Sequence, residues 1–256
     1  MGKDILVIGG KGKTGQRVVD RLTDSGTRTP TGARDRFFNW ADSASVAAFE
    51  RCSAVYLVAP TDRTDHLDVM RPILASAIER GVRRFVLLSS SMLDRDGPMM
   101  GGVHAWLADT APEWAVLRPS WFMQNFREEN AIYSATGTAR VGFIDAEDIA
   151  AAAVACLNST TPLNDDRILT GPEALSYEDT ARILSDVTGR TIRHVALTTQ
   201  DLADRFEEQG LPTDYARMLA NMDETISAGA EDRTTARVAQ LTGTSPGSFR
   251  SFAAEN

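Results

Sequence analysis

Short apolar runs alternate with amphipathic segments along the first half of the chain. The runs at 4–8, 54–59 and 85–88 show no alternation of apolar and polar positions, which is typical of strands covered by helices on both faces. Between the last two runs, residues 66–80 place apolar side chains at helical spacing, and Gly81 ends the pattern. Strands that alternate with helices indicate βαβ units, so the predicted fold class is α/β with a doubly wound parallel sheet.

The second half of the chain has a different pattern. Polar caps precede three predicted helices, the first of which spans 145–157, and the apolar runs between the helices are short. We therefore expect a first domain at 1–120, against which helix 145–157 packs, and a smaller, helix-rich C-terminal lobe formed mostly by 121–256. The caps are Asp145, Ser176 and Thr198.

Composition and charge exclude several classes of protein. Of the 256 residues, 43% are hydrophobic and 24% charged, as in an ordinary globular protein. The net charge of −8 repels phosphate backbones, and the longest apolar run, 149–157, is too short to cross a bilayer. We expect no nucleic-acid partner, no membrane partner and no metal, because His66, His194, Cys52 and Cys156 show no metal-ligand spacing. Two cysteines suggest reduced thiols and a cytoplasmic location.

A glycine-rich turn follows the first predicted strand. Glycines are needed in such a turn because a side chain would block a pyrophosphate, whose charge is met by backbone N–H groups and the helix dipole. The ending Gly12-Lys13-Thr14 also imitates a P-loop, but that motif requires glycine where this chain has Val7. The pattern predicts dinucleotide binding, and a purely structural turn is the alternative. The residues that fit G-x-G-x-x-G and its variant are Gly9, Gly10, Lys11, Gly12, Lys13, Thr14 and Gly15.

The end of the second strand predicts which nicotinamide cofactor binds. A weak strand at 29–33 is followed by Arg34 and Asp35. Arginine accommodates the 2′-phosphate of NADP, whereas an acidic residue holds the ribose of NAD. Because Arg34 comes first and Lys11 and Lys13 add positive charge, NADP(H) is favoured. Binding of NAD(H), with Asp35 on the ribose and Arg34 in solvent, is the alternative.

Two further segments follow predicted strands. The carboxyl ends of parallel strands form the edge at which ligands bind, so these segments are candidates for contacts with cofactor or substrate. Ordinary turn residues are the alternative. The segments are Ala59, Pro60 and Thr61, and Ser89, Ser90 and Ser91.

With the glycine turn, the segments 85–91 and 117–125 resemble the NmrA-like group of atypical short-chain dehydrogenases/reductases, particularly its ergot-alkaloid-type NAD(P)H-dependent reductases. The resemblance runs nearly end to end and includes 143–150, 169–177 and 210–215. It implies a Rossmann domain with a C-terminal substrate lobe, and a reductase that transfers hydride to a small organic acceptor such as an imine, enone or quinone. Some members of the group bind dinucleotide without catalysis, so a redox-sensing regulator acting through a protein partner is the alternative.

The chain lacks the catalytic acid of ordinary short-chain dehydrogenases. Those enzymes carry Tyr-x-x-x-Lys after the serine strand, but 85–110 contains neither residue type and no lysine follows Lys13. Ser91, polarising the acceptor, and His104, supplying a proton, are then the candidate catalytic residues. A hydrogen-bonded helix residue is the alternative for His104. The stretch 125–131 is also shorter than in relatives with this motif.

An aromatic and amide segment after Pro119 is the candidate substrate wall. Such side chains could enclose a flat, apolar small molecule, and plain packing of the lobe is the alternative. The residues are Trp121, Phe122, Met123, Gln124 and Asn125.

Overall fold

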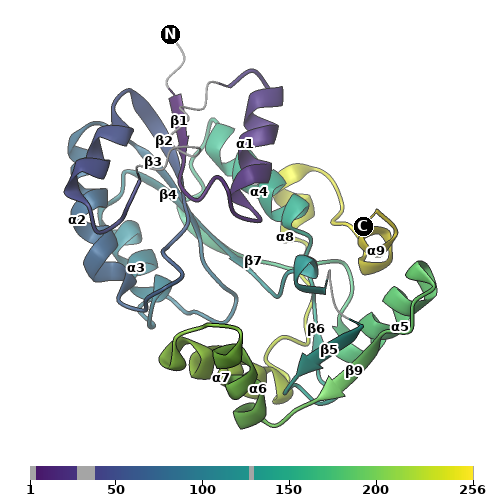
Figure 1. Cartoon of the computed structure of the whole chain (residues 1–256). Helices are drawn as coiled ribbons and strands as arrows, with labels where there is room; N and C mark the ends of the chain where they lie inside the picture. The colour runs from purple at the N-terminus through teal and green to yellow at the C-terminus, as the bar shows by residue number, and fades with distance from the viewer. Residues whose placement is uncertain (1–3, 28–37, 127–129, 256) are drawn as a thin grey trace. The chain divides into compact units, whose positions relative to one another are not determined.

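The computed structural model describes residues 4–27, 38–126 and 130–255. Contacts within the chain divide it into two units (Figure 1). Unit 1 contains 1–119, 146–168 and 240–243, and unit 2 contains 120–145, 169–239 and 244–256.

Unit 1 is built on a five-stranded sheet of order β1-β2-β3-β4-β7. The pairs β1–β2, β2–β3 and β3–β4 are parallel. The predicted α/β class with a parallel sheet is therefore confirmed. The strands are β1 (Asp4–Val7), β2 (Cys52–Leu57), β3 (Arg84–Leu88), β4 (Glu113–Pro119) and β7 (Asp165–Leu169).

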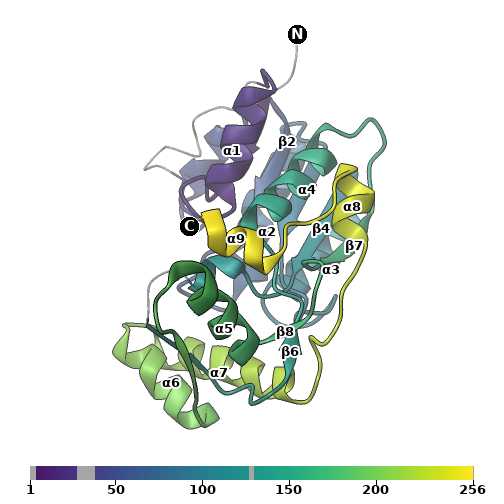
Figure 2. The same ribbon diagram turned by 90° about the vertical axis from the view of Figure 1, so that its right-hand side faces the viewer.

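Helices cover both faces of this sheet. On one face α1 (Gly15–Asp24) packs against α4 (Ala146–Asn158), and on the other α2 (His66–Glu79) packs against α3 (Met100–Thr110) (Figures 1 and 2). The short helix η2 (Ser43–Phe49) packs on α2. Burial on both sides explains why the central strands are apolar without alternation.

Two small sheets lie in unit 2. The parallel pair is β5 (Ala131–Ser134) with β9 (Arg193–Ala196), and the antiparallel pair is β6 (Arg140–Val141) with β8 (Leu175–Ser176). Because these strands are short, most of the remaining order in unit 2 comes from helices.

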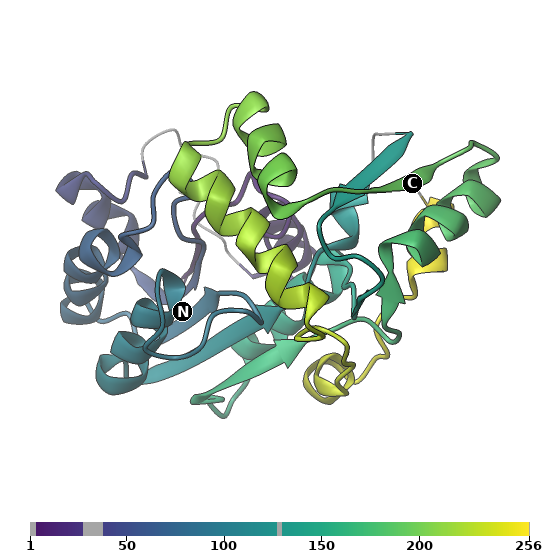
Figure 3. The same ribbon diagram turned by 90° about the horizontal axis from the view of Figure 1, so that it is seen from below.

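The helices of unit 2 form two packed pairs. The predicted caps at Ser176 and Thr198 are present, since each side chain accepts a hydrogen bond from the backbone N–H three residues later. Helix α5 packs on α9, and α6 packs on α7 (Figure 3). The helices are η3 (Met123–Phe126), α5 (Tyr177–Thr188), α6 (Thr199–Glu208), α7 (Thr213–Ser227), α8 (Arg237–Thr242), which spans the unit boundary, and α9 (Phe249–Glu255).

No helix within the described ranges is long and apolar enough to cross a membrane. Cys52 and Cys156 are both free, buried thiols. Burial raises the pKa of each thiol to about 11, so both stay protonated at neutral pH.

Candidate functional site

The glycine turn leads directly from β1 into α1. Gly9 has a φ of +77°, and its carbonyl accepts the N–H of Gly12 at 2.8 Å. A Cβ on Gly9 would lie 2.8 Å from the Cβ of Val58, and one on Gly15 would lie 2.2 Å from the carbonyl oxygen of Gly9. Neither position has room for a side chain, so the path of the turn itself requires glycine.

A buried tyrosine supports this turn. The Tyr56 hydroxyl donates to the Thr14 Oγ1 at 3.0 Å, and Tyr56 is fully buried in β2. Burial raises the pKa of Tyr56 well above its usual value, so the phenol stays protonated as the donor. Sequence reasoning missed Tyr56, although a tyrosine within an otherwise aliphatic strand needs a partner for its hydroxyl.

The turn and the start of α1 fit the pyrophosphate of a dinucleotide. Gly9, Lys11, Gly12 and Lys13 are exposed, and the first turn of α1 carries no acidic residue. A helix N-terminus with adjacent lysines and open backbone favours an anion. Arg34 and Asp35, which the sequence assigns to the choice between NADP and NAD, lie outside the described residues.

The other predicted cofactor residues lie at the same sheet edge. Because β1, β2 and β3 are parallel neighbours, the segments that follow them meet at their carboxyl ends. The structure thus brings 9–15, 59–61 and 89–91 together. In these segments Ala59 is buried, Pro60 half-buried and Thr61 exposed.

The serine turn continues the pairing of β3 with β4. The N–H of Ser89 donates to the carbonyl oxygen of Leu117 at 2.8 Å, and the N–H of Ser91 donates to the carbonyl oxygen of Pro119 at 2.9 Å. Ser89 and Ser91 are buried, and Ser90 is half-buried. Among the described residues the buried Oγ of Ser89 has no hydrogen-bond partner. Buried polar groups are normally satisfied, so this hydroxyl is a candidate for a ligand contact.

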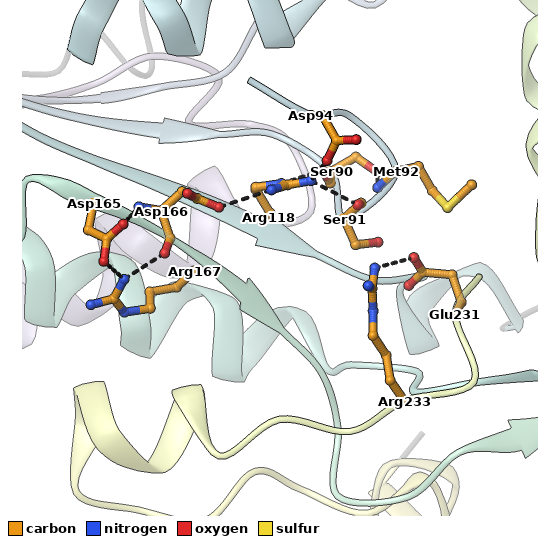
Figure 4. Close-up of polar contacts among 10 residues, drawn as sticks. All are labelled: Ser90, Ser91, Met92, Asp94, Arg118, Asp165, Asp166, Arg167, Glu231 and Arg233. Carbon is orange, nitrogen blue, oxygen red and sulfur yellow. Dashed lines mark hydrogen bonds and ion pairs between the residues drawn. The ribbon is translucent and has the colours of Figure 1, made fainter. Parts of the chain in front are cut away.

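Arg118, at the end of β4, anchors the serine turn (Figure 4). Its guanidinium donates to the carbonyls of Ser90 (Nε, 3.3 Å) and Ser91 (Nη2, 3.1 Å). It also contacts the carboxylates of Asp94 (Nη2, 2.6 Å) and Asp166 (Nη1, 3.0 Å). Only 10% of the Arg118 side chain is exposed. The sequence analysis did not identify Arg118 as a site residue, although an arginine within an otherwise apolar strand usually requires partners for its charge.

His104 lies in a largely apolar setting. It is 1% exposed, and its ring centroid lies 5.6 Å from that of Trp114. Neither ring nitrogen has a hydrogen-bond partner among the described residues. Burial lowers the pKa of His104, with Asp166 opposing the change, so the neutral imidazole dominates at pH 7. The catalytic role of His104 stays a prediction, and this setting does not favour it.

The candidate substrate residues belong to unit 2. Trp121 and Phe122 are half-buried and Asn125 is exposed, whereas Met123 and Gln124 are buried. Gln124 donates from Nε2 to Asp145 at 2.6 Å. Within this segment Trp121, Phe122 and Asn125 therefore keep accessible surface for a ligand. The buried indole N–H of Trp121 has no acceptor among the described residues.

Comparison with known proteins places the chain among nicotinamide-dependent enzymes. Residues 39–160 match a family model described as NAD(P)H-binding. The chain is 40% identical to the uncharacterized oxidoreductase YesF of Bacillus subtilis, over 98% of this chain and 94% of YesF. It is 39% identical to the agroclavine dehydrogenase of Claviceps fusiformis, over 98% of this chain and 96% of that enzyme.

A solved structure shows the same fold. The NADPH complex of the quinone oxidoreductase QOR2 from Escherichia coli superposes with a TM-score of 0.82 at 18% identity, covering 98% of this chain and 99% of that one. Fold, glycine turn and relatives define an NAD(P)H-binding oxidoreductase of the Rossmann class. The chain belongs to the NmrA-like family of atypical short-chain dehydrogenases/reductases, which confirms the resemblance read from its motifs.

Proposed function

We propose that the protein is a reductase that transfers hydride from NADPH to a small organic acceptor such as an imine, an enone or a quinone. The observation that carries this proposal is the glycine turn, which joins β1 to α1 with open backbone, two exposed lysines and no acidic first-turn residue. NADPH supplies the hydride when it is bound. The names of the relatives, a dehydrogenase of agroclavine and a quinone oxidoreductase, support a reaction at an organic acceptor.

In this proposal each candidate segment has a separate role. The glycine turn holds the pyrophosphate, and Arg34 accommodates the 2′-phosphate. Ser91 polarises the acceptor, Arg118 positions the serine turn, and the aromatic segment after Pro119 contacts the acceptor in unit 2. Further cofactor contacts come from Ala59, Pro60, Thr61, Ser89 and Ser90, and further acceptor contacts from Met123, Gln124 and Asn125.

The missing Tyr-x-x-x-Lys restricts the acceptor. A ketone develops alkoxide charge as hydride arrives and therefore needs an acid, but 85–110 holds no tyrosine or lysine and His104 favours its neutral form. An iminium ion already carries the positive charge and needs no proton. Positioning and electrostatics then account for most of the rate.

We expect rapid oxidation of bound NADPH by imines or strongly activated acceptors, and little by simple ketones. Stopped-flow measurement of nicotinamide fluorescence across a matched panel checks this. Ser91→Ala should cost less than about tenfold with an iminium acceptor, because the rate there depends little on polarisation by one hydroxyl. Silence toward every acceptor would favour the regulator that acts through a protein partner, and ready oxidation of alcohols would reveal an acid elsewhere.

We also expect the protein to bind NADPH more tightly than NADH. A charge-assisted contact between arginine and phosphate contributes about 1.5–3 kcal/mol, which is roughly ten- to hundredfold in the dissociation constant. Fluorescence titration of the two cofactors measures this difference, and Arg34→Glu should abolish it. Equal affinities in the unmodified protein would contradict the assignment of Arg34.

A further inference from the structure

Unit 2 contains a buried carboxylate that has no counter-ion among the residues that the structure describes. Asp223, on α7, is 5% exposed. One oxygen, Oδ2, accepts the backbone N–H of Ala135 at 2.8 Å. Within the part of the chain that the structure describes, no arginine, lysine or histidine forms an ion pair with Asp223. Carboxylates are rarely buried this far unless they are paired.

A second buried acid of unit 2, Glu231, has a cationic partner. Glu231 is 1% exposed, and its Oε1 contacts the guanidinium of Arg233 at 2.8 Å (Figure 4). Removing a charge from such a pair leaves its partner unmatched, whereas removing the charge of Asp223 would leave no unmatched cation among the described residues.

The hydrogen bond to Ala135 does not explain the charge of Asp223. The side-chain oxygen of an asparagine could accept the same N–H without any buried charge. Burial raises the pKa of Asp223 to about 6, although the Ala135 hydrogen bond opposes the change. At pH 7 the carboxylate is therefore still mostly ionised, and the fold bears a charge that its own contacts do not require.

Tyr177, His194 and Arg205 are the titratable or charged side chains to consider around Asp223. Burial raises the pKa of Tyr177, and the negative charge of Asp223 raises it further. The Tyr177 ring stacks on the His194 ring, with the two centroids 5.8 Å apart. Burial lowers the pKa of His194 and so favours its neutral form. On the neighbouring helix α6, the guanidinium of Arg205 lies 3.7 Å from the centre of the Tyr133 ring. A buried carboxylate with the aromatic side chain of Tyr177 near it is a setting suited to an organic cation.

We propose that Asp223 is the counter-ion for a positively charged group of the ligand that unit 2 binds, so that this unit selects organic cations over their neutral analogues. The identification of that ligand with the hydride acceptor rests on the proposed function. The cation site itself rests on the burial of Asp223, on its contacts and on the lack of a counter-ion for it in residues 4–27, 38–126 and 130–255.

A matched pair of probes tests the proposal directly. N-methylquinolinium has a fixed positive charge, and quinoline is its neutral analogue at pH 8. Isothermal titration calorimetry with the holoprotein, saturated with NADP⁺ so that no hydride moves, should show at least about tenfold tighter binding of the cation. Asp223→Asn should abolish this preference, whereas Glu224→Gln, the same loss of charge at the exposed next residue of α7, should retain it.

The pH dependence and the stability give independent readouts. Because the charge of N-methylquinolinium is fixed, its preference should fall as pH decreases through about 6, where Asp223 takes up a proton. The raised pKa means that ionised Asp223 lowers stability as pH rises from about 4 through 6. Asp223→Asn should therefore raise the Tm at pH 8 by roughly 5 °C and leave it unchanged at pH 4.

Equal binding of the two probes would overturn the proposal, and so would a preference for the cation that survives in Asp223→Asn. A lower Tm for that variant at pH 8 would also overturn it, because it would assign Asp223 a structural role. Absence of binding by both probes would also count against it. Turnover separates this proposal from the proposed function. Reduction of a neutral quinone without any cation preference would refute only the cation site, and cation binding without reduction of any acceptor would refute only the reductase.

Discussion

Replacing Arg118 by methionine should lower the free energy of unfolding by about 3–5 kcal/mol, the usual consequence of breaking a buried charged network. The side chain is only 10% exposed. Its loss would leave the carbonyls of Ser90 and Ser91 without this donor, and each unsatisfied buried group costs about 1–3 kcal/mol. The pair with Asp94 adds little, because that carboxylate is 89% exposed. The carbonyl contacts and the pair with Asp166 therefore dominate the effect.

Thermal denaturation measures this change. At roughly 2–4 °C per kcal/mol for a protein of this size, the Tm of Arg118→Met should fall by about 6–20 °C. Arg95→Met is the matched control, because Arg95 pairs with Asp109 at the surface, with exposures of 48% and 69%. That variant should lose less than about 1 kcal/mol. NADPH affinity should fall for Arg118→Met alone, since the serine turn would lose its anchor. Equal, small effects in both variants would show that Arg118 does not hold the turn.

The strands of unit 1 could be predicted from sequence because both of their faces are buried. The runs expected at 4–8, 54–59 and 85–88 correspond to β1, β2 and β3, with ends displaced by no more than two residues. Helix starts were also predictable where a local side chain caps them, as at Ser176 and Thr198. These features depend on residues close together in the chain.

The contacts that hold the site together could not be predicted in the same way. Arg118 reaches Asp94 and Asp166, 24 and 48 positions away, and Tyr56 reaches Thr14 across 42 positions. No local pattern links such residues, so only the assembled sheet reveals them. The strand-end rule still placed 59–61 and 89–91 at one edge, because it depends on topology alone.

The burial of Asp223 is a second feature that the sequence alone does not predict. An aspartate followed by a glutamate within a polar helix ordinarily indicates a solvated face. In the structure Glu224 is exposed but Asp223 is buried, because α7 turns it inward. The spacing of Asp223 from the buried Ala216, Ala220 and Ile226 is that of one helical face, so periodicity is compatible with its burial, but its charge argues against a buried position. The sequence therefore leaves the burial of Asp223 undecided, and the structure decides it.

Two glycine variants should separate the structural role of the turn from its binding role. A Cβ on Gly15 would lie 2.2 Å from the Gly9 carbonyl oxygen and 2.9 Å from the Gly10 Cα, so Gly15→Ala must displace backbone. We expect a loss of about 3 kcal/mol in stability and a large loss of NADPH binding. A Cβ on Gly12 would meet only the Gly9 carbonyl oxygen, at 3.2 Å, and otherwise open space.

Gly12→Ala should therefore keep the fold, losing at most about 1 kcal/mol in stability, but weaken NADPH binding by at least about tenfold, because its methyl group occupies the place of the pyrophosphate. Gly102→Ala, within α3, is the control: its Cβ would meet Leu67 at 3.4 Å, and alanine favours the helix by about 0.5–1 kcal/mol. Fluorescence titration with NADPH, alongside thermal denaturation, distinguishes the outcomes. If Gly12→Ala bound NADPH as tightly as the unmodified protein, the turn would be structural only. If it lost binding at nearly unchanged Tm, the open backbone of the turn would be the contact surface for the dinucleotide.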